Sequence, residues 1–418
     1  MKVVVAGQGY VGLPLAIRAA EVGYHVVGFD VDIQRVKRLA AGDSYVEDVS
    51  RDQLLAALDS GRYTPTSTPG DMANFDVAVI TVPTPLRNGI PDLSYVEQSA
   101  HQIAHYLRPN ATVILESTTY PGTTTQLVRP ILEEISGWKA GTSFHLGFSP
   151  ERIDPGNQHW SFRTTPKIVS GVNAGSLKAV RAFYDSLVDT TVPVSTPDVA
   201  ELAKIIENTF RHVNIALVNE LAEFAHLLGI DVHEALDAAA TKPFGFMRFN
   251  PGPGVGGHCL PIDPAYLSWY VEQQTGRKVR LIDLANDIND HRPDYVVQRL
   301  VDGLNARRKP LNGSVVVLLG MAYKRNSSDM RASPSVRVAE LLAERGARVY
   351  AIDPHVTEAN IDMPGIRVNY DISLIREADA VVLLTDHDLF KYEEIADNAA
   401  YVLDCRRRMA PSVRVELL

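Results

Sequence analysis

The sequence predicts an α/β protein with two doubly wound domains, joined by a helical middle domain that contains one long helix. Near both ends of the chain, short apolar and β-branched runs alternate with helical segments, as expected for parallel sheets covered by helices. Strand signals are scarce between these two regions. At 418 residues the chain is also too long for one ordinary core. We therefore expect domains at residues 1–196, 197–295 and 296–418.

The composition is that of a globular protein without a nucleic-acid or membrane partner. Hydrophobic residues make up 45% and charged residues 22% of the chain, which is ordinary for a soluble protein. The formal charge of −9 would not attract nucleic acid or an anionic membrane, and no apolar run approaches the roughly 18 residues of a membrane span. Two cysteines, Cys259 and Cys405, cannot build a disulfide framework. We expect a cytoplasmic protein.

The N-terminal segment carries a dinucleotide fingerprint in its full context. A buried strand is predicted at 2–6, a helix at 13–22, and a second strand at 25–29 that ends in Asp30. The turn before the helix consists of Gly7, Gln8, Gly9, Tyr10, Val11 and Gly12. Its glycines allow a tight turn, the approach of a pyrophosphate, and close packing of helix and strand. We predict a Rossmann-like domain that binds NAD, because Asp30 would accept from ribose hydroxyls, although Arg35 is close enough to weaken this preference.

Polar residues follow the next strands of this domain. Strands are predicted at 76–82, 112–115 and 144–148, and ligands of doubly wound sheets bind beyond the strand C-termini. The side chains expected there are Thr84, Thr118, Thr119 and Glu151. For the three threonines, ordinary turn and cap chemistry is an equally good explanation.

A long helix is predicted over residues 195–228, because this stretch has Pro197 in its first turn and no later Gly or Pro. About thirty residues at 1.5 Å each span roughly 45–50 Å, which is longer than one domain needs. Such a helix suits a connection between domains or an oligomer interface. Lys204, Asn208 and Arg211 share one face. That face is either solvated or, if it lines a cleft, suited to an oxyanion and a phosphate.

A glycine-rich run at 250–257 leads to His258, Cys259 and, four residues on, Asp263. Glycine has no Cβ, so this backbone can pass close to a ligand. Cys259 is therefore either a reactive thiol at a site or a small buried hydrophobic residue.

The C-terminal third repeats the order of the first thirty residues. A strand at 313–320, a helix at 334–345 and a strand that ends at Asp353 follow one another. The loop after the first strand lacks the G-x-G-x-x-G pattern and carries three cations. These are Lys324, Arg325 and Arg331. We predict a second Rossmann-like domain that suits another phosphate-bearing ligand better than a second dinucleotide. Cys405 ends an apolar strand and is expected to be structural.

Three stretches together resemble the UDP-glucose/GDP-mannose dehydrogenase family. They are residues 5–14 (VAGQGYVGLP), 201–208 (ELAKIIEN) and 256–263 (GGHCLPID). The likeness implies an NAD-binding domain, a helical middle domain and a domain for a UDP-sugar, usually in dimers formed through the long helix. It also implies oxidation of the C6 alcohol of a nucleotide sugar to a carboxylate, with two NAD and one water.

The resemblance implies covalent catalysis by Cys259. Its thiol would attack the aldehyde formed by the first hydride transfer, and oxidation of the thiohemiacetal would give a thioester for water to cleave. Lys204 would stabilise the alkoxide and Asn208 would bind the oxyanion. Asp263 would assist the movement of water or a proton.

Further roles are implied residue by residue. Glu151 matches a carboxylate that handles the hydrolytic water, and Thr119 matches a threonine that orients it. Cofactor contacts are implied for Gly7, Gly9, Tyr10, Val11, Gly12, Asp30, Arg35, Thr84, Thr118 and Arg331. Substrate contacts are implied for Arg152, Arg211, Phe249, Gly256, Lys324 and Arg406. No metal is expected.

The resemblance leaves the sugar open between a UDP-N-acetylhexosamine and UDP-glucose. His258 beside Cys259, and Arg152 after the Pro-Glu pair, are similar to the branch that acts on UDP-N-acetylhexosamines. His258 either tunes the thiol or only fills the loop. Two other functions remain as alternatives: a β-hydroxyacid-type dehydrogenase without a covalent step, and a nucleotide-sugar sensor without catalysis.

Overall fold

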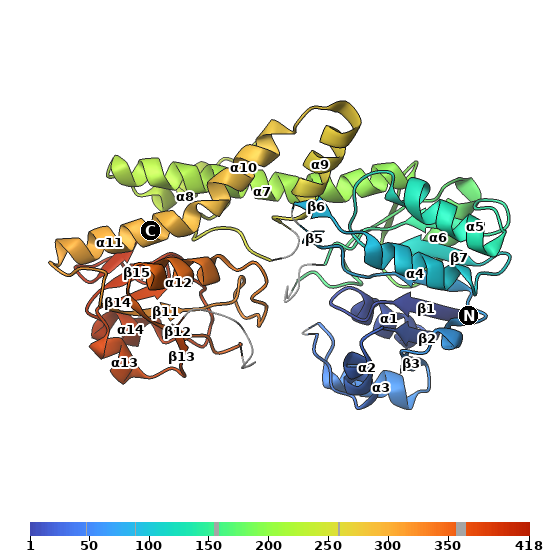
Figure 1. Cartoon of the computed structure of the whole chain (residues 1–418), viewed down its shortest axis with the longest axis horizontal. Helices are drawn as coiled ribbons and strands as arrows, with labels where there is room; N and C mark the ends of the chain where they lie inside the picture. Colours follow the sequence, from blue (N-terminus) through green and yellow to red (C-terminus); the bar gives the residue numbers. More distant parts are fainter. Residues whose placement is uncertain (47, 88, 154–158, 258–259, 357–364) are drawn as a thin grey trace. The chain divides into compact units, whose positions relative to one another are not determined.

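The computed structural model shows a chain organised as two compact units (Figure 1). The residues that the structure describes are 1–46, 48–87, 89–153, 159–257, 260–356 and 365–418. The two units comprise Met1–Glu207 with Trp269–Gly276, and Asn208–Ser268 with Arg277–Leu418. Helix α7 (Pro197–Leu227) and helix α9 (Asp263–Thr275) contribute residues to both units. The division into three domains stays a prediction.

Within the described residues, the first unit contains a six-stranded parallel sheet with the strand order β3-β2-β1-β4-β7-β8. Its strands are β1 (Lys2–Ala6), β2 (His25–Phe29), β3 (Tyr63–Thr66), β4 (Val77–Ile80), β7 (Thr112–Leu115) and β8 (His145–Phe148). All residues of β4 and β7 are buried, as expected for a parallel sheet covered on both faces. The strand order reverses between β1 and β4, which is where such sheets bind ligands.

The strands of this sheet face two hydrophobic cores, one on each side. Val3 and Val5 belong to one core, and Val4 and Ala6 to the other, because successive side chains point to opposite faces. The first core is covered by α1 (Gly12–Glu21), α3 (Arg51–Asp59) and α6 (Ala174–Asp185). The second is covered by α4 (Ser94–Ala104) and α5 (Arg129–Ser136). Smaller elements of the unit are α2 (Ile33–Ala40), the turns η1 (Pro69–Met72) and η2 (Thr123–Val128), and strands β5 (Leu86–Arg87), β6 (Ile90–Pro91), β9 (Lys167–Val169) and β10 (Thr191–Pro193).

Helix α7 lies within the predicted range 195–228. It starts with Pro197, whose ring suits the first helical turn, and Gly229 follows its last turn with a left-handed φ of +68°. Six of its large apolar side chains are between 45% and 56% exposed: Val199, Ile206, Phe210, Leu217, Leu221 and Phe224. Among the helices that the structure describes, none is long and apolar enough to cross a membrane.

The middle of the chain is helical, as predicted. Besides α7 and α9 it contains α8 (Val232–Ala240) and α10 (Arg280–Asp290).

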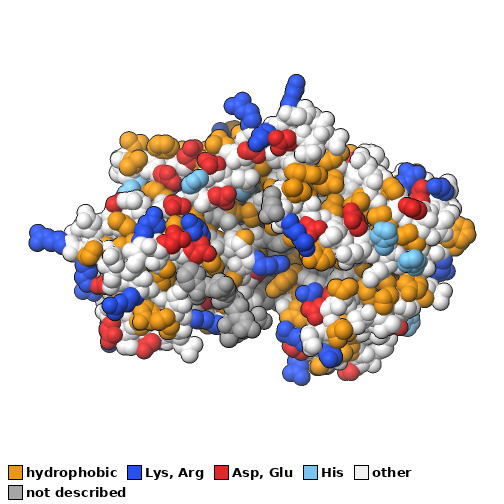
Figure 2. Space-filling view, in the orientation of Figure 1, with side chains coloured by type: hydrophobic (Ala, Val, Ile, Leu, Met, Phe, Trp, Pro, Cys, Tyr) orange, Lys and Arg blue, Asp and Glu red, His pale blue; other side chains and the backbone are white. Residues whose placement is uncertain are grey.

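Charged side chains of both signs are interspersed over the face shown in Figure 2, which agrees with the many exposed ion pairs between them.

The second unit contains, in its described part, another six-stranded parallel sheet, with the order β13-β12-β11-β14-β15-β16. Its strands are β11 (Val315–Leu319), β12 (Arg348–Ile352), β13 (Ile366–Arg367), β14 (Ala380–Leu383), β15 (Val402–Asp404) and β16 (Val415–Leu417). One face packs against α11 (Arg292–Ala306) and α12 (Pro334–Glu344), and the other against α13 (Ile372–Glu377) and α14 (Tyr392–Asn398). The two sheets and the helical middle confirm the predicted fold class.

Candidate active site

The glycine turn between β1 and α1 has the geometry of a phosphate loop. Gly7 has φ +95°, and a Cβ on it would lie 2.9 Å from the Thr81 carbonyl oxygen. A Cβ on Gly12 would overlap the Gly7 carbonyl oxygen, so both positions require glycine. A Cβ on Gly9, in contrast, would meet nothing within 4 Å. The open side of the turn is therefore at Gly9, where a pyrophosphate would approach, followed by the N-terminus of α1.

Asp30, directly after β2, links this turn to Arg35. Its Oδ2 accepts hydrogen bonds from the Gln8 backbone N–H at 2.8 Å and from Arg35 Nη1 at 3.0 Å. Oδ1 accepts from the Asp32 backbone N–H at 3.0 Å. The Arg35 guanidinium also lies over the ring of Tyr45, 5.5 Å from its centre. Asp30 thus orders the loop at the position where the fingerprint places the ribose contact. Tyr10 and Val11, the remaining predicted residues of the turn, lie between Gly9 and Gly12.

The predicted threonines lie where β4 and β7 end. Thr84 Oγ1 donates to the Thr118 carbonyl oxygen at 2.8 Å, so these two loops are joined. Thr119 is fully buried, and its hydroxyl has no hydrogen-bond partner within the described ranges. A buried hydroxyl of this kind is suited to a ligand or a water molecule.

Glu151 and Lys204 form a buried charge pair. Lys204 Nζ lies 3.7 Å from Glu151 Oε2, and both side chains are largely buried. Burial raises the pKa of Glu151, and the positive charges of Lys204 and Lys167 oppose that rise. Arg152, the next residue, pairs with Glu207 at 2.7 Å and donates to the Pro166 carbonyl oxygen at 2.6 Å.

A second buried ion pair, between Lys167 and Glu116, was not predicted, and it contacts the backbone next to Glu151. Lys167 Nζ binds the Glu116 carboxylate and donates at 3.0 Å to the carbonyl oxygen of Pro150, the residue before Glu151. The Tyr184 hydroxyl donates to the other oxygen of Glu116 at 2.6 Å. Glu116 directly follows β7, whereas Lys167 belongs to β9 and Tyr184 to α6, so no local sequence pattern could have identified them.

Glu201 anchors α7 one turn before Lys204. This fully buried carboxylate accepts from the backbone N–H groups of Gly122 at 2.6 Å and Thr124 at 2.8 Å, and from the Thr124 hydroxyl at 2.6 Å. Burial raises its pKa to about 7, against these hydrogen bonds. Glu201 belongs to the ELAKIIEN stretch, one helical turn before Lys204, and its place in that motif was the signal that could have found it.

In the second unit, Asn208 and Asp263 meet directly. Asn208 Nδ2 donates to Asp263 Oδ2, and Asp263 is 2% exposed. Both belong to predicted catalytic positions, although 55 residues separate them in sequence. Cys259 and His258 lie outside the described residues.

The described part of the glycine-rich run packs against the loop that follows β11. The Gly257 backbone N–H donates to the Arg331 carbonyl oxygen at 3.0 Å. A Cβ on Gly256 would lie 2.7 Å from Tyr323 Cβ and 2.8 Å from the Ala332 carbonyl oxygen. Further back, a Cβ on Gly252 would lie 2.9 Å from Arg406 Nη1. The glycines therefore permit a close approach to the cation-bearing loop.

The remaining predicted substrate and cofactor residues of this unit have varied surroundings. Arg406 donates through Nε to the Leu384 carbonyl oxygen at 2.6 Å. Phe249 packs edge-on against Phe210, with ring centres 5.8 Å apart. Arg331 is largely exposed and forms a two-pronged ion pair with Asp329. Arg211 is exposed on α7, and Lys324 is half-buried in the loop after β11.

The predicted site residues are distributed over both units. The glycine turn, Asp30, Arg35, the three threonines, Glu151, Arg152 and Lys204 belong to the first. Asn208, Arg211, Phe249, Gly256, Asp263, Lys324, Arg331 and Arg406 belong to the second.

Models of the UDP-glucose/GDP-mannose dehydrogenase family match the chain in three parts. The NAD binding domain matches residues 1–188, the central domain residues 198–291, and the UDP binding domain residues 317–411. The chain is 34% identical to the UDP-N-acetyl-D-mannosamine dehydrogenase of Pyrococcus horikoshii, over 94% of this chain and 90% of that protein. It is 37% identical to the UDP-N-acetyl-D-glucosamine 6-dehydrogenase of Pseudomonas aeruginosa, over 85% and 83%.

A solved structure agrees with these matches. The structure of the UDP-D-ManNAc dehydrogenase from Pyrococcus horikoshii superposes with a TM-score of 0.89 at 32% identity, covering 100% of this chain and 98% of that one.

Proposed function

Because the chain belongs to the UDP-glucose/GDP-mannose dehydrogenase family, we propose that it oxidises the C6 alcohol of a UDP-sugar to the uronic acid. A UDP-N-acetylhexosamine is favoured over UDP-glucose, since several relatives are named for such substrates. Two polar contacts support the proposal most directly: the ion pair of Glu151 with Lys204 and the hydrogen bond of Asn208 with Asp263. Both lie on segments that match the family's motifs.

NAD is the cofactor, and the glycine turn fits it. When bound, NAD accepts a hydride in each of the two oxidations. Gly9 leaves room for the pyrophosphate, and the N-terminus of α1 offers N–H groups to its oxygens. Asp30 would accept from a ribose hydroxyl through Oδ1, which has one donor within the described ranges, while Oδ2 is shared by Gln8 and Arg35.

The residues of the first unit suit proton and water handling. In the first oxidation the C6 hydroxyl would pass its proton to water, a transfer that Asp263 would assist, and the Lys204 ammonium would stabilise the alkoxide. In the last step Glu151 would take a proton from water, and burial makes its carboxylate a stronger base because the pKa is raised. The Thr119 hydroxyl, which has no partner in the described part of the chain, would hold that water.

Cys259 would supply the covalent step. Its thiolate adds to the C6 aldehyde to form a C–S bond, and loss of a hydride from the thiohemiacetal gives a thioester. Water then cleaves the C–S bond, releasing the carboxylate and the thiol. The Asn208 amide has a second N–H besides the one that donates to Asp263, and this N–H would bind the oxyanion.

The C-terminal sheet would hold the substrate. A UDP binding domain model matches this region, and Lys324 and Arg406 would pair with the diphosphate. Arg152, Arg211, Phe249 and Gly256 would line the sugar, with Arg331 reaching the cofactor. We further propose that the three predicted domains correspond to cofactor binding, assembly and substrate binding.

A homodimer through α7 is part of the proposal. Its half-exposed apolar side chains form a series along the helix, and a surface of that kind is usually covered by a partner. A cytoplasmic location would give the enzyme access to NAD and UDP-sugars.

The stoichiometry of NADH tests the four-electron reaction. A panel of UDP- and other NDP-sugars is incubated with NAD, and NADH and product mass are measured. We expect two NADH per sugar consumed and a product 14 mass units heavier, since CH2OH becomes COOH. A constant ratio of one NADH per sugar would contradict the covalent route.

Substitution of the thiol separates this route from the alternatives. Cys259→Ala should lower turnover by roughly a thousandfold or more, because nucleophile and oxyanion site act as one unit. Cys405→Ala is the matched control, since burial raises the pKa of that thiol to about 12 and leaves it inert. Full turnover by Cys259→Ala would favour the β-hydroxyacid-type reaction. If the wild-type protein binds NAD and a UDP-sugar tightly but transfers no hydride, a sensor would be favoured.

A further inference from the structure

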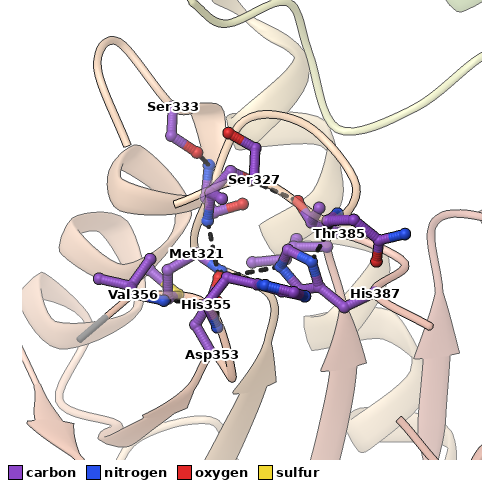
Figure 3. A network of polar contacts seen from close by, with 12 residues as sticks. Met321, Ser327, Ser333, Asp353, His355, Val356, Thr385 and His387 are labelled. Atoms are coloured by element: carbon purple, nitrogen blue, oxygen red, sulfur yellow. Dashed lines mark hydrogen bonds and ion pairs between the residues drawn. The ribbon is translucent and has the colours of Figure 1, made fainter. Parts of the chain in front are cut away.

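A buried carboxylate in the second unit is saturated with hydrogen bonds. Asp353 follows β12, and its Oδ2 accepts from the backbone N–H groups of Met321 at 2.7 Å and Ala322 at 2.9 Å, and from His387 Nε2 at 3.0 Å (Figure 3). Its Oδ1 accepts from the backbone N–H groups of the two residues His355 and Val356. The five donors that the described residues supply exceed the roughly four lone-pair sites of a carboxylate. Asp353 therefore serves as an internal anchor.

His387 is held in one tautomer by its two partners. Its Nδ1 lies 2.9 Å from the Asn326 backbone N–H, which can only donate, so Nδ1 accepts. The proton of the neutral ring is then on Nε2, which donates to Asp353. His387 is completely buried. A neutral ring thus connects the carboxylate after β12 with the loop after β11.

The attachments of this loop lie on both sides of Lys324. Two residues before it, the Ala322 carbonyl oxygen accepts from Thr385 Oγ1 at 2.6 Å. Two residues after it, the Asn326 backbone N–H donates to His387, and the Asn326 side chain exchanges hydrogen bonds of 2.6 and 3.0 Å with Asp388. Asn326 also has a left-handed φ of +55°, which these contacts hold in place.

We propose that His387 is a positioning residue for the UDP moiety of the substrate, acting through the backbone on either side of Lys324. A lysine has a long flexible stem, so it contributes more to diphosphate binding when its backbone is ordered before the ligand arrives. Through Nδ1 the His387 ring holds Asn326, and through Asp353 it holds Met321 and Ala322 at the other end. This role rests on the proposed substrate contact of Lys324.

Two substitutions separate the two hydrogen bonds of the ring. In His387→Asn the amide oxygen can take the place of Nδ1 and accept from Asn326, but the donor to Asp353 is lost. In His387→Gln the amide nitrogen can take the place of Nε2 and donate to Asp353, but the acceptor for Asn326 is lost. Both variants keep a polar group in the buried position.

The readout is the dissociation constant of UDP, measured by calorimetry on the full-length protein. We expect His387→Gln to weaken UDP binding by about five- to tenfold. This factor corresponds to the free energy of one hydrogen bond, the bond from the Asn326 backbone N–H that the variant loses. His387→Asn should stay within about twofold of the wild type while its midpoint of thermal unfolding falls. With the sugar substrate, KM should rise in His387→Gln and kcat should not change. NAD affinity should be the same in all three proteins.

A double-mutant cycle keeps the test decisive if a variant is unstable. If His387 acts through Lys324, Lys324→Ala and the double variant Lys324→Ala/His387→Gln should bind UDP equally weakly. Additive losses, or equal losses in His387→Asn and His387→Gln, would overturn the positioning role. An unchanged UDP affinity in Lys324→Ala would instead remove Lys324 from the substrate site, and absence of NADH formation by the wild type would refute the proposed function itself.

Discussion

The two six-stranded sheets share one frame but differ in the acid that follows their second strand. In both, the glycine after the first strand has a left-handed φ, +95° at Gly7 and +85° at Gly320, and donates to the last residue of the second strand. Among the described residues, Asp30 then accepts hydrogen bonds from three groups, and one of its oxygens has a single donor. Asp353 accepts from five groups of the described part of the chain.

This difference shows how one fold serves two ligands. An acid with an unfilled lone pair at a glycine turn suits a ribose, whereas a saturated acid can only support neighbouring loops. The turns also differ, because the first unit has Gly9 and Gly12 after its first strand, whereas the corresponding loop of the second unit carries Lys324 and Arg331. The function resides in the loops, and the sheet only presents them.

The largest expected effect concerns the buried ion pair of the first unit, for which the second unit offers an exposed counterpart. Lys167→Met leaves Glu116 buried without its cation and should lower the free energy of unfolding by about 3–5 kcal/mol. Lys309→Met removes the half-exposed partner of Asp379 and should lower the free energy of unfolding by about 1 kcal/mol or less. Denaturant unfolding followed by tryptophan fluorescence measures the first loss, because all three tryptophans, at 138, 160 and 269, lie in the first unit.

A double variant tests whether the unpaired charge of Glu116 causes the loss of stability. Lys167→Met/Glu116→Gln should regain part of the lost stability, since no unpaired charge remains. Equal losses in the two single lysine variants would show that burial of the pair is unimportant.

The two units should also respond to pH in opposite directions. Burial raises the pKa of Glu201 in the folded protein to about 7, from an ordinary value of 4.5. Its contribution to stability is therefore constant below pH 4.5 and falls by about 3 kcal/mol as the pH rises to 7. Burial would raise the pKa of Asp353, but its hydrogen bonds to His387 and to backbone N–H groups lower it below 3.8. The stability that this carboxylate contributes is therefore present above pH 3.8 and is lost as the pH falls below that value.

Glu201→Gln isolates the first of these effects. The fall in stability between pH 4.5 and 7, followed by tryptophan fluorescence, should be smaller than in the wild type. Glu134→Gln, at an exposed position on α5, should leave the curve unchanged. Identical pH curves for Glu201→Gln and the wild type would rule out the titration of Glu201.

The smallest expected effect concerns whether the NAD site and the UDP site bind their ligands independently. Gly12→Ala places a methyl group against the Gly7 carbonyl and should displace the phosphate turn, raising the dissociation constant of NAD by about a hundredfold. UDP affinity should not change. Gly70→Ala is the control, because a Cβ there meets nothing within 4 Å. Loss of UDP binding in Gly12→Ala would mean that the two ligand sites are not independent.

The sequence by itself determined the fold class, the long helix and the cofactor. These depend on local patterns: apolar periodicity, a glycine turn in context, and a proline and a glycine at the two ends of α7. The edge strands β3, β13 and β16 were not predicted, because they are short and their pairing depends on the strand beside them. The catalytic positions were implied by the resemblance to the family, and the Asn208–Asp263 contact joins two of them.

Only the tertiary structure decided which polar groups support those positions. Lys167 reaches Glu116 across 51 residues, and His387 reaches Asp353 across 34. A charge or an imidazole in an apolar stretch does not reveal its partner, since that partner is chosen by which strands lie side by side. The glycine turn could be recognised from adjacent residues, whereas the difference between Asp30 and Asp353 could not. The number of donors around a carboxylate is set by the packing of loops that are distant in sequence.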